Sequence, residues 1–101
     1  MKSPDECSSI EEVRAAIDEI DYEVVKALAL RAQYVKAVTR FKKTKEDVKA
    51  PARQAIVISQ RRAWAAEEGL DPELVENLYR MVMDHFVAEE MRELHLVESE
   101  Q

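Results

Sequence analysis

Apolar residues recur at helical spacing through the first 40 or so positions of the chain. One heptad register holds Ile10, Ile17, Val24 and Val38, and the register beside it holds Leu28 and Val35. Ser9 followed by Glu12 has the spacing of a capping box, so the helix is expected to begin after Ser8 or Ser9. No Gly or Pro interrupts the segment before about Lys43. The pattern predicts one helix of roughly 33 residues, about 50 Å long.

A polar stretch separates this helix from a second one. Residues 43–49 are mostly charged and are predicted to form a solvated loop rather than a nucleic-acid patch. Pro51 suits the first turn of a helix, and Gly69 is a typical C-terminal stop. The second helix is therefore expected to run from Pro51 to about Glu68.

A third helix is indicated by the dipeptide that follows. Asp71 is a good N-cap, and Pro72 suits the first helical position. The helical pattern then continues to about Val97. The chain is predicted to be all-α, with a long, a shorter and a long helix in a single domain that spans residues 1–101.

Composition narrows the class of protein. The 101 residues include one Gly and one Cys, which excludes a Gly-rich phosphate loop, a dinucleotide fingerprint and a turn-dense β-sandwich. The net charge of −6 argues against general nucleic-acid binding. No apolar run approaches the ~18 residues of a membrane span, and the N-terminal MKSPDECSS lacks the apolar stretch of a signal peptide. The single Cys7 fits a reducing compartment, so a cytoplasmic protein without a nucleic-acid or membrane partner is expected.

Three cationic residues lie on the apolar seam of the first helix: Arg14, Arg31 and Lys42. A buried cation needs an anionic partner, because an uncompensated buried charge is strongly destabilising. Within this helix, Asp21 is the one acid on the seam. One interpretation is that the cations pair with protein carboxylates or extend outward at the edge of the seam. The alternative, which three cations on one seam favour, is a cavity that receives an anionic ligand.

Helix geometry sets the distances between these cations. Arg31 and Lys42 are 11 positions apart, about 16 Å along a helix axis, so two long side chains could hold one small ligand. Arg14 lies 17 positions before Arg31, about 25 Å away, which is too far within one chain. Two first helices that pair antiparallel and cross near residue 25 bring Arg14 of one chain to Arg31 and Lys42 of the other. The sequence therefore predicts a homodimer with two composite sites.

The second helix adds another candidate cation. Its apolar stripe contains Arg53, Ile56, Val57, Gln60 and Trp64. Arg53 lies one turn after the polar stretch and is either a ligand-binding cation beside a lid or an exposed residue near a helix start. Trp64 is expected in the core.

Glu90 lies on an apolar flank of the third helix, together with Tyr79, Met83, Val87 and Leu94. Apolar surroundings favour a neutral, protonated carboxyl, which can donate a hydrogen bond to a ligand oxygen. The alternatives are that Glu90 is a surface acid or that it pairs with one of the seam cations. His85 and His95 are ten positions apart and Cys7 is remote from both. This is poor spacing for metal ligands, so no metal site is predicted.

Motifs spread over nearly the whole chain resemble the all-helical chorismate mutase family. They are Ile-x-x-Val-Arg14-x-x-Ile-Asp-x-Ile-Asp21, Ala-Leu-x-x-Arg31, Tyr34-Val-Lys-Ala, Arg40-Phe-Lys42, Ala50-Pro-x-Arg53 and Arg62-Ala-Trp-Ala-x-Glu-x-Gly-Leu-Asp71. The resemblance is greatest to the isochorismate pyruvate lyase branch of salicylate and siderophore biosynthesis. It implies an intertwined homodimer of three-helix chains.

The resemblance also implies roles for the matching residues. Arg14 of the partner chain and Arg31 would hold the two carboxylates of the substrate, isochorismate or chorismate. Lys42 would contact the ether oxygen as the main electrostatic catalyst. Arg53 would close over the site with the loop before it. Val35 and Val87 would form an apolar wall of the site. The reaction would need no cofactor and no metal.

Departures from the family pattern bear on the activity. Family mutases commonly have Asp and Glu at the positions of Ala50 and Gln54. The absence of the Asp, together with the Ala-Pro-x-Arg and Arg-Ala-Trp-Ala segments, resembles the lyase branch. Both branches often have Gln at the position of Glu90, although some fungal mutases have Glu. An ionised Glu90 would repel the substrate's oxygens, so it is expected to work protonated, with activity rising toward mildly acidic pH. The activity implied is an isochorismate pyruvate lyase with possible weak mutase activity. The alternatives are a chorismate mutase and a non-catalytic helical dimerisation or regulatory module.

Overall fold

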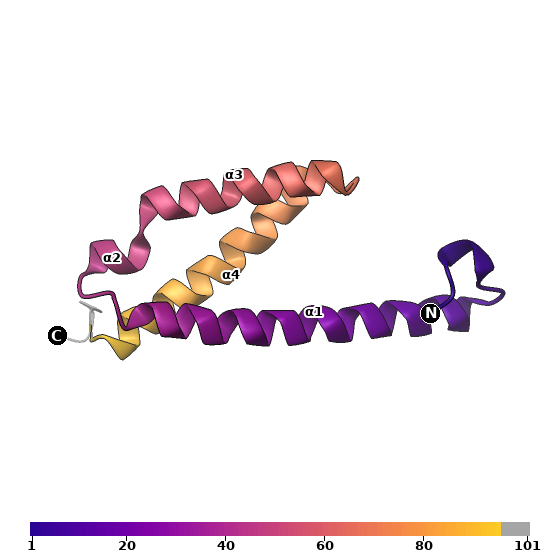
Figure 1. Cartoon of the computed structure of the whole chain (residues 1–101), viewed down its shortest axis with the longest axis horizontal. Coiled ribbons are helices and arrows are strands. Elements are labelled where there is room, and N and C mark those ends of the chain that lie inside the picture. Colours follow the sequence, from indigo (N-terminus) through magenta and orange to yellow (C-terminus); the bar gives the residue numbers. More distant parts are fainter. Residues whose placement is uncertain (96–101) are drawn as a thin grey trace. The chain divides into compact units, whose positions relative to one another are not determined.

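The computed structural model describes residues 1–95, and its regular elements over that range are helices. In chain order they are η1 (Pro4–Glu6), α1 (Ile10–Thr39), α2 (Lys45–Lys49), α3 (Pro51–Glu67) and α4 (Pro72–Glu93) (Figure 1). The chain forms two compact units, Met1–Tyr34 and a second that begins at Val35. The predicted all-α class and the three main helices are confirmed. No helix within residues 1–95 is long and apolar enough to cross a membrane.

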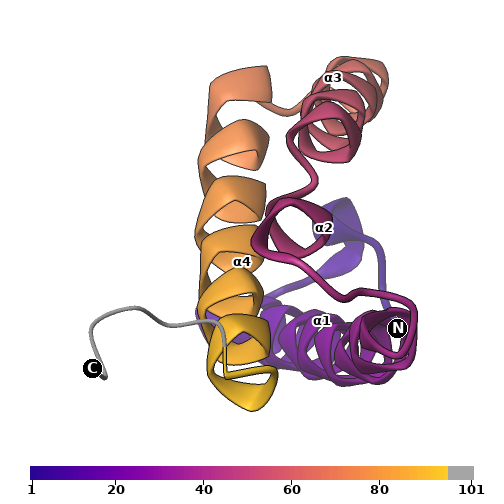
Figure 2. The ribbon, with the colours of Figure 1, turned by 90° about the vertical axis from the view of Figure 1, so that its left-hand side faces the viewer.

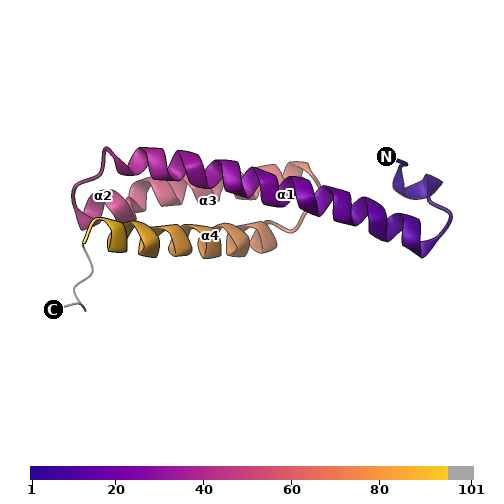
Figure 3. The same ribbon diagram turned by 90° about the horizontal axis from the view of Figure 1, so that it is seen from below.

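The N-terminus of α1 is capped as the sequence predicts. The Ser9 hydroxyl accepts a hydrogen bond from the Glu12 backbone N–H at 3.1 Å. The Glu12 carboxylate accepts from the backbone N–H of Ser8 at 2.9 Å, one residue earlier than in a standard capping box. It also forms an ion pair with Lys2 at 3.3 Å, which ties the N-terminal segment to the first turn of α1. The ribbon turns back between η1 and the start of α1 (Figure 3).

The first helix is continuous but ends earlier than expected. It stops at Thr39 instead of near Lys43. The backbone N–H groups of Arg40, Phe41 and Lys42 donate to the carbonyls three residues before them, at 3.3, 2.9 and 3.0 Å. These tighter bonds close the last turn and take the chain off the helix path. Lys42 therefore lies beyond α1, and the distance of 16 Å along one axis from Arg31 does not apply to it.

The polar stretch contains a short helix that was predicted as loop. Thr44 caps α2 by accepting from the Asp47 N–H at 3.1 Å, and Asp47 accepts in return from the Thr44 N–H at 3.2 Å. The apolar member of α2, Val48, is almost fully buried, and α2 contacts α4. The capping box and this single buried side chain explain why five mostly charged residues form a helix here.

Helices α3 and α4 pack against each other and form the core of the second unit (Figure 2). Val57 and Ile58 of α3 meet Met83 of α4, and Tyr79 packs against this cluster. The turn between the helices contains Gly69, which has a φ of 77° that suits glycine. Asp71 caps α4 by accepting from the Glu73 N–H at 2.9 Å. The predicted end of this helix near Val97 lies outside the described residues, and within them α4 ends at Glu93.

The buried residues of α3 share Val57 with the stripe predicted from the sequence, but otherwise differ from it. Val57, Ile58 and Ala65 are buried, whereas Trp64, which was expected in the core, is 50% exposed. Both faces of α3 carry apolar residues, and α4 covers the face with Val57 and Ile58. Trp64 instead stacks with Arg61, whose guanidinium carbon lies 4.6 Å from the ring centroid.

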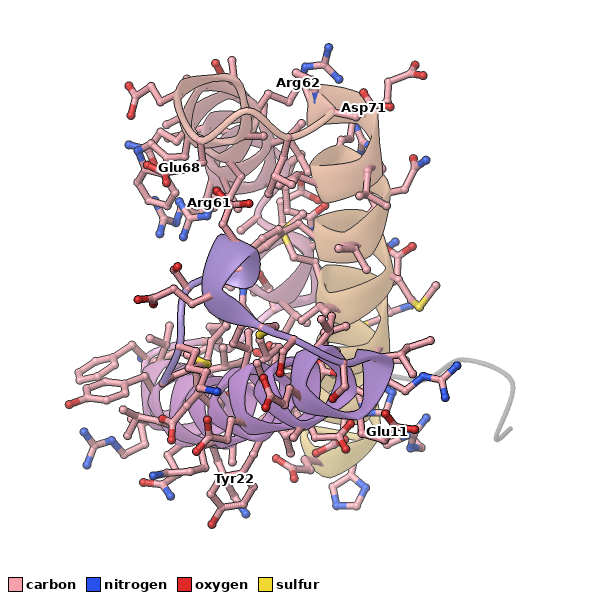
Figure 4. All side chains as sticks on the ribbon, turned by 90° about the vertical axis from the view of Figure 1, so that its right-hand side faces the viewer. Glu11, Tyr22, Arg61, Arg62, Glu68 and Asp71 are labelled. Carbon is pink, nitrogen blue, oxygen red and sulfur yellow. The ribbon has the colours of Figure 1, made fainter. Side chains whose placement is uncertain are left out.

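Charged side chains join α3 to α4 outside the core. Arg61 and Arg62 are neighbours but leave α3 in different directions (Figure 4). Arg62 forms an ion pair of 2.7 Å with Glu76 of α4, which also accepts from Arg80 at 2.7 Å. Hydrogen bonds from Arg80 and then Arg62 lower the pKa of Glu76 below its ordinary value of 4.5.

Candidate functional site

Lys42 and Glu90 are brought together within the second unit. The Lys42 ammonium lies 3.0 Å from Glu90 Oε2, and the side chains are 18% and 7% exposed. A carboxylate this deeply buried needs a cationic or hydrogen-bonding partner. In the structure Glu90 therefore has a seam cation as its partner, which was one of the interpretations that the sequence left open.

A third polar residue, Thr39, completes this cluster and was not singled out from the sequence. Its hydroxyl lies 3.2 Å from the same Oε2 of Glu90 and 3.1 Å from the carbonyl oxygen of Val35. Thr39 is 7% exposed and is the one buried residue of α1. A signal was present, because Thr39 lies four residues after Val35 and three before Lys42, on the face that carries the candidate site residues.

The turn after α1 explains how these three groups meet. Thr39 is on the last turn of the helix, and the three hydrogen bonds that follow change the chain direction before Lys42. Glu90 is near the C-terminal end of α4. A longer α1 would carry Lys42 onward along the helix axis. The early end of α1 is therefore what allows the ammonium to reach Glu90.

Asp47 adds a second carboxylate in the electrostatic range of Lys42. Its pKa is lowered from 3.8, first by the backbone N–H of Lys43, then by that of Thr44, and least by the charge of Lys42. The Lys43 N–H donates to Asp47 Oδ2 at 2.9 Å. The pKa of Asp47 is therefore set mainly by the cap of α2 and only slightly by Lys42.

Arg53 is exposed in the first turns of α3, directly after α2. The joint between the two helices is Ala50, which has a left-handed backbone with φ 39° and ψ 61°. Such a conformation is unfavourable for a residue with a Cβ, by roughly 1–2 kcal/mol. The chain makes this sharp bend at a non-glycine residue so that α2 and α3 follow one another with only Ala50 between them.

The two valines expected in an apolar wall are half-buried within the second unit. Val35 lies near the end of α1, and Val87 lies on α4 one turn before Glu90. Val35 also supplies the carbonyl that the Thr39 hydroxyl approaches. Both residues are therefore on the same elements as the Lys42–Glu90–Thr39 cluster.

Arg14 and Arg31 belong to the first unit. Both lie on the uninterrupted part of α1, where Arg14 is exposed and Arg31 is half-buried. Their 17-residue spacing corresponds to about 25 Å on a continuous helix. The predicted continuity of the helix between these two cations is therefore confirmed. Apolar residues exposed on the same helix include Ile17, Val24 and Leu28.

The cluster offers a partly buried ammonium whose attraction for anions depends on Glu90. An ionised Glu90 offsets the charge of Lys42, whereas a neutral Glu90 leaves a net positive site that can also donate a hydrogen bond. Within residues 1–95 no group of three or more His, Cys, Asp or Glu side chains has a metal-binding arrangement.

Comparison with known proteins gives these residues a family context. A protein of Pseudomonas aeruginosa named isochorismate pyruvate lyase is 40% identical over 92 residues, which cover 91% of each chain. Residues 13–91, which include Arg14, Arg31, Lys42, Arg53 and Glu90, match the chorismate mutase type II family. The chain therefore belongs to the chorismate mutase type II family.

Proposed function

We propose that the protein is an isochorismate pyruvate lyase that converts isochorismate to salicylate and pyruvate. The observation that carries this choice is the 40% identity, over 91% of both chains, to the lyase of Pseudomonas aeruginosa. The partly buried Lys42 supports it, because an ammonium in such surroundings stabilises developing negative charge more strongly than one in water. The single Cys7 supports a cytoplasmic location.

The proposed reaction is a concerted pericyclic elimination. One hydrogen moves from the ring to the methylene carbon of the enolpyruvyl group while the ether C–O bond breaks. The ring becomes aromatic as salicylate, and the side chain leaves as pyruvate, so no external acid, base or electron carrier is consumed. The protein contributes by holding the substrate in a reactive conformation and by placing cations near the ether oxygen.

Four cations are proposed to bind the substrate. Arg14 of the partner chain and Arg31 hold its two carboxylates, and Lys42 contacts the ether oxygen. Arg53 closes over the site together with α2, with the bend at Ala50 as the joint. The short α2 and the left-handed Ala50 support this role, because they place Arg53 at the start of α3 next to a separate small element.

Glu90 is proposed to work in its protonated form, with Val35 and Val87 forming the apolar wall beside it. The 3.0 Å contact between Lys42 and Glu90 supports a dependence on its charge. An ionised Glu90 pairs with the Lys42 ammonium that the ether oxygen needs, and its negative charge repels the substrate. Protonation releases Lys42 and adds a hydrogen-bond donor.

A homodimer with two composite sites is proposed. Exposed apolar residues along α1 support a partner helix on this face, and Arg14 is too far along the helix to act with Arg31 of its own chain. In an intertwined arrangement each α1 contributes Arg14 to one site and Arg31 to the other.

A two-substrate assay tests the proposed activity. Purified protein is given isochorismate or chorismate separately, while salicylate is followed by fluorescence and chorismate by its loss of absorbance. Salicylate from isochorismate is expected, with weak turnover of chorismate. The runner-up, a chorismate mutase, is favoured by the family match over residues 13–91. Turnover of chorismate to prephenate without salicylate formation would support that alternative, and no turnover of either would favour a non-catalytic dimerisation or regulatory module.

A further inference from the structure

We propose that Thr39 is a positioning residue for Glu90, and that its hydroxyl determines both the charge of this carboxyl and which oxygen carries the proton. The inference rests on the proposed lyase function for its catalytic meaning, but its geometry does not depend on the substrate. It assigns a role to a side chain that contacts Glu90 and not the reacting atoms.

The burial of Thr39 is the first observation. It is 7% exposed, and the other buried polar residue within positions 1–95 is Glu90. Threonine is a modest helix former, so neither helix propensity nor apolar burial explains it at this position. Buried polar groups are nearly always hydrogen-bonded, and the two here contact each other.

The hydroxyl has one hydrogen and two acceptors within reach. It lies 3.1 Å from the Val35 carbonyl oxygen and 3.2 Å from Glu90 Oε2. A hydrogen bond to an ionised carboxylate is roughly twice as strong as one to a neutral group. The hydrogen therefore points to Glu90 when the carboxyl is ionised and can turn to Val35 when it is neutral. Thr39 thus stabilises the ionised form of Glu90.

The same contacts distinguish the two carboxyl oxygens. Lys42 and Thr39 both lie against Oε2, and among the first 95 residues no hydrogen bond reaches Oε1. Protonation is expected on the oxygen that does not already accept from two donors. The neutral carboxyl then presents the Oε1 hydroxyl as the donor for a substrate oxygen, and its uncharged Oε2 no longer holds Lys42 in an ion pair.

Other charged groups near these elements are engaged elsewhere or exposed. On α2, Asp47 bonds to the backbone of Lys43 and Thr44, and Lys45 also has a partner. On α3, Arg61 stacks on Trp64 and Arg62 pairs with Glu76, while Arg53 is exposed. On α4, Glu89 pairs with His85, and Arg92 and Glu93 are exposed. The remaining charged residues of α2 are exposed as well: Glu46 and Lys49. Lys42 is thus the charged group in direct contact with Glu90 in this part of the chain.

The test compares Thr39→Val, which keeps the shape but removes the hydroxyl, with Thr39→Ser, which keeps the hydroxyl. The Glu90 side-chain carboxyl is followed by carbon NMR during a pH titration, and kcat/KM for isochorismate is measured over the same range. In Thr39→Val, the carboxyl signal of Glu90 should change at a higher pH than in the unmodified protein, because one charge-assisted hydrogen bond to the ionised form is lost. The decline of kcat/KM toward high pH should shift by the same amount. Thr39→Ser should behave as the unmodified protein.

A second background separates positioning from a structural role. In Glu90→Gln, adding Thr39→Val should leave the pH profile unchanged, because no ionisable group remains for the hydroxyl to act on. If Thr39→Val does not fold, as judged by circular dichroism, Thr39→Ala is compared with Thr39→Ser in the same way.

Two results would overturn the proposal: an unchanged Glu90 titration in Thr39→Val, or equal shifts in the Val and Ser variants. Failure of the lyase function is distinguishable from both. A protein that turns over neither substrate would remove the proposed activity, while the NMR titration would still show whether Thr39 controls the protonation of Glu90.

Discussion

The ammonium of Lys42 lies 3.0 Å from Glu90 Oε2, so the proposed catalyst of the site is already paired with a buried carboxyl of its own chain. The two residues are 48 positions apart, and they meet because the chain leaves α1 after Thr39. Any ligand that uses Lys42 must therefore compete with Glu90 or wait for it to be neutralised.

Replacement of Lys42 by Ala should abolish turnover and destabilise the protein. Loss of one preorganised donor at a developing negative charge typically lowers kcat by about 10²–10³-fold. The unpaired Glu90 should lower the free energy of unfolding at neutral pH by about 1–3 kcal/mol. Activity assays and urea denaturation measure the two effects. Lys43→Ala, one residue later with an exposed side chain, is the matched control and should change neither.

The double variant Lys42→Ala/Glu90→Gln separates these two effects. It should recover most of the stability, since no buried charge is left, but none of the activity. Full activity in Lys42→Ala would remove Lys42 from the proposed mechanism. An unchanged stability would mean that the Lys42–Glu90 contact is not maintained in solution.

Substitution of Glu90 by Gln should flatten the pH dependence of the reaction. In the unmodified protein kcat/KM is expected to rise from mildly alkaline to mildly acidic pH, because the neutral carboxyl both releases Lys42 and donates a hydrogen bond. The amide of Gln donates at every pH and carries no charge. Steady-state rates across this range give the comparison, and identical profiles for the two proteins would refute the role of Glu90.

Mixed dimers can establish whether Arg14 acts across the interface. Arg14→Ala and Lys42→Ala are each expected to be inactive alone. A dimer that contains one of each has one site with both residues intact and one with neither, so a random mixture should recover about a quarter of the normal activity. Co-expression with two affinity tags isolates the mixed dimer. If Arg14 served the site of its own chain, the mixed dimer would stay inactive.

Acid should weaken the N-terminal cap of α2 through Asp47. Its folded-state pKa is lowered below 3.8, chiefly by the backbone N–H groups of Lys43 and Thr44. A lowered folded-state pKa contributes stability that is present above the unfolded value and is lost as the pH falls through the folded value. Asp47→Asn should therefore be less stable at neutral pH and show a smaller loss on acidification. Thermal unfolding at several pH values measures the difference, and Glu46→Gln on the same helix is the control. Parallel stability curves for Asp47→Asn and the unmodified protein would argue against this cap.

Local signals in the sequence were sufficient for the main helices. Ser9, Pro51 and Asp71 mark helix starts through capping or a preset backbone angle, and Gly69 marks a stop through its positive φ. Each signal acts on atoms only a few residues away, so it can be recognised in the sequence without knowledge of the tertiary structure.

The features that escaped prediction depend mostly on distant residues. The end of α1 at Thr39 goes with the contact between Lys42 and Glu90, and the exposure of Trp64 follows from the face of α3 that α4 covers. The short α2 is different, because Thr44 and Asp47 are a readable capping box. The segment was predicted as a loop because it is short and mostly charged. Thr39 was missed because its importance comes from Glu90, 51 positions later.

The unbroken course of α1 from Ile10 to Thr39 has a consequence for how this chain can change in length. Each residue added to a helix rotates everything after it by about 100°. An insertion of one residue between Arg14 and Arg31 would change the angle between their two side chains around the helix axis by about 100°, whereas a seven-residue insertion would nearly keep that angle but move them about 10 Å further apart. The segment between these two arginines therefore cannot change in length without changing their separation, their relative orientation or both.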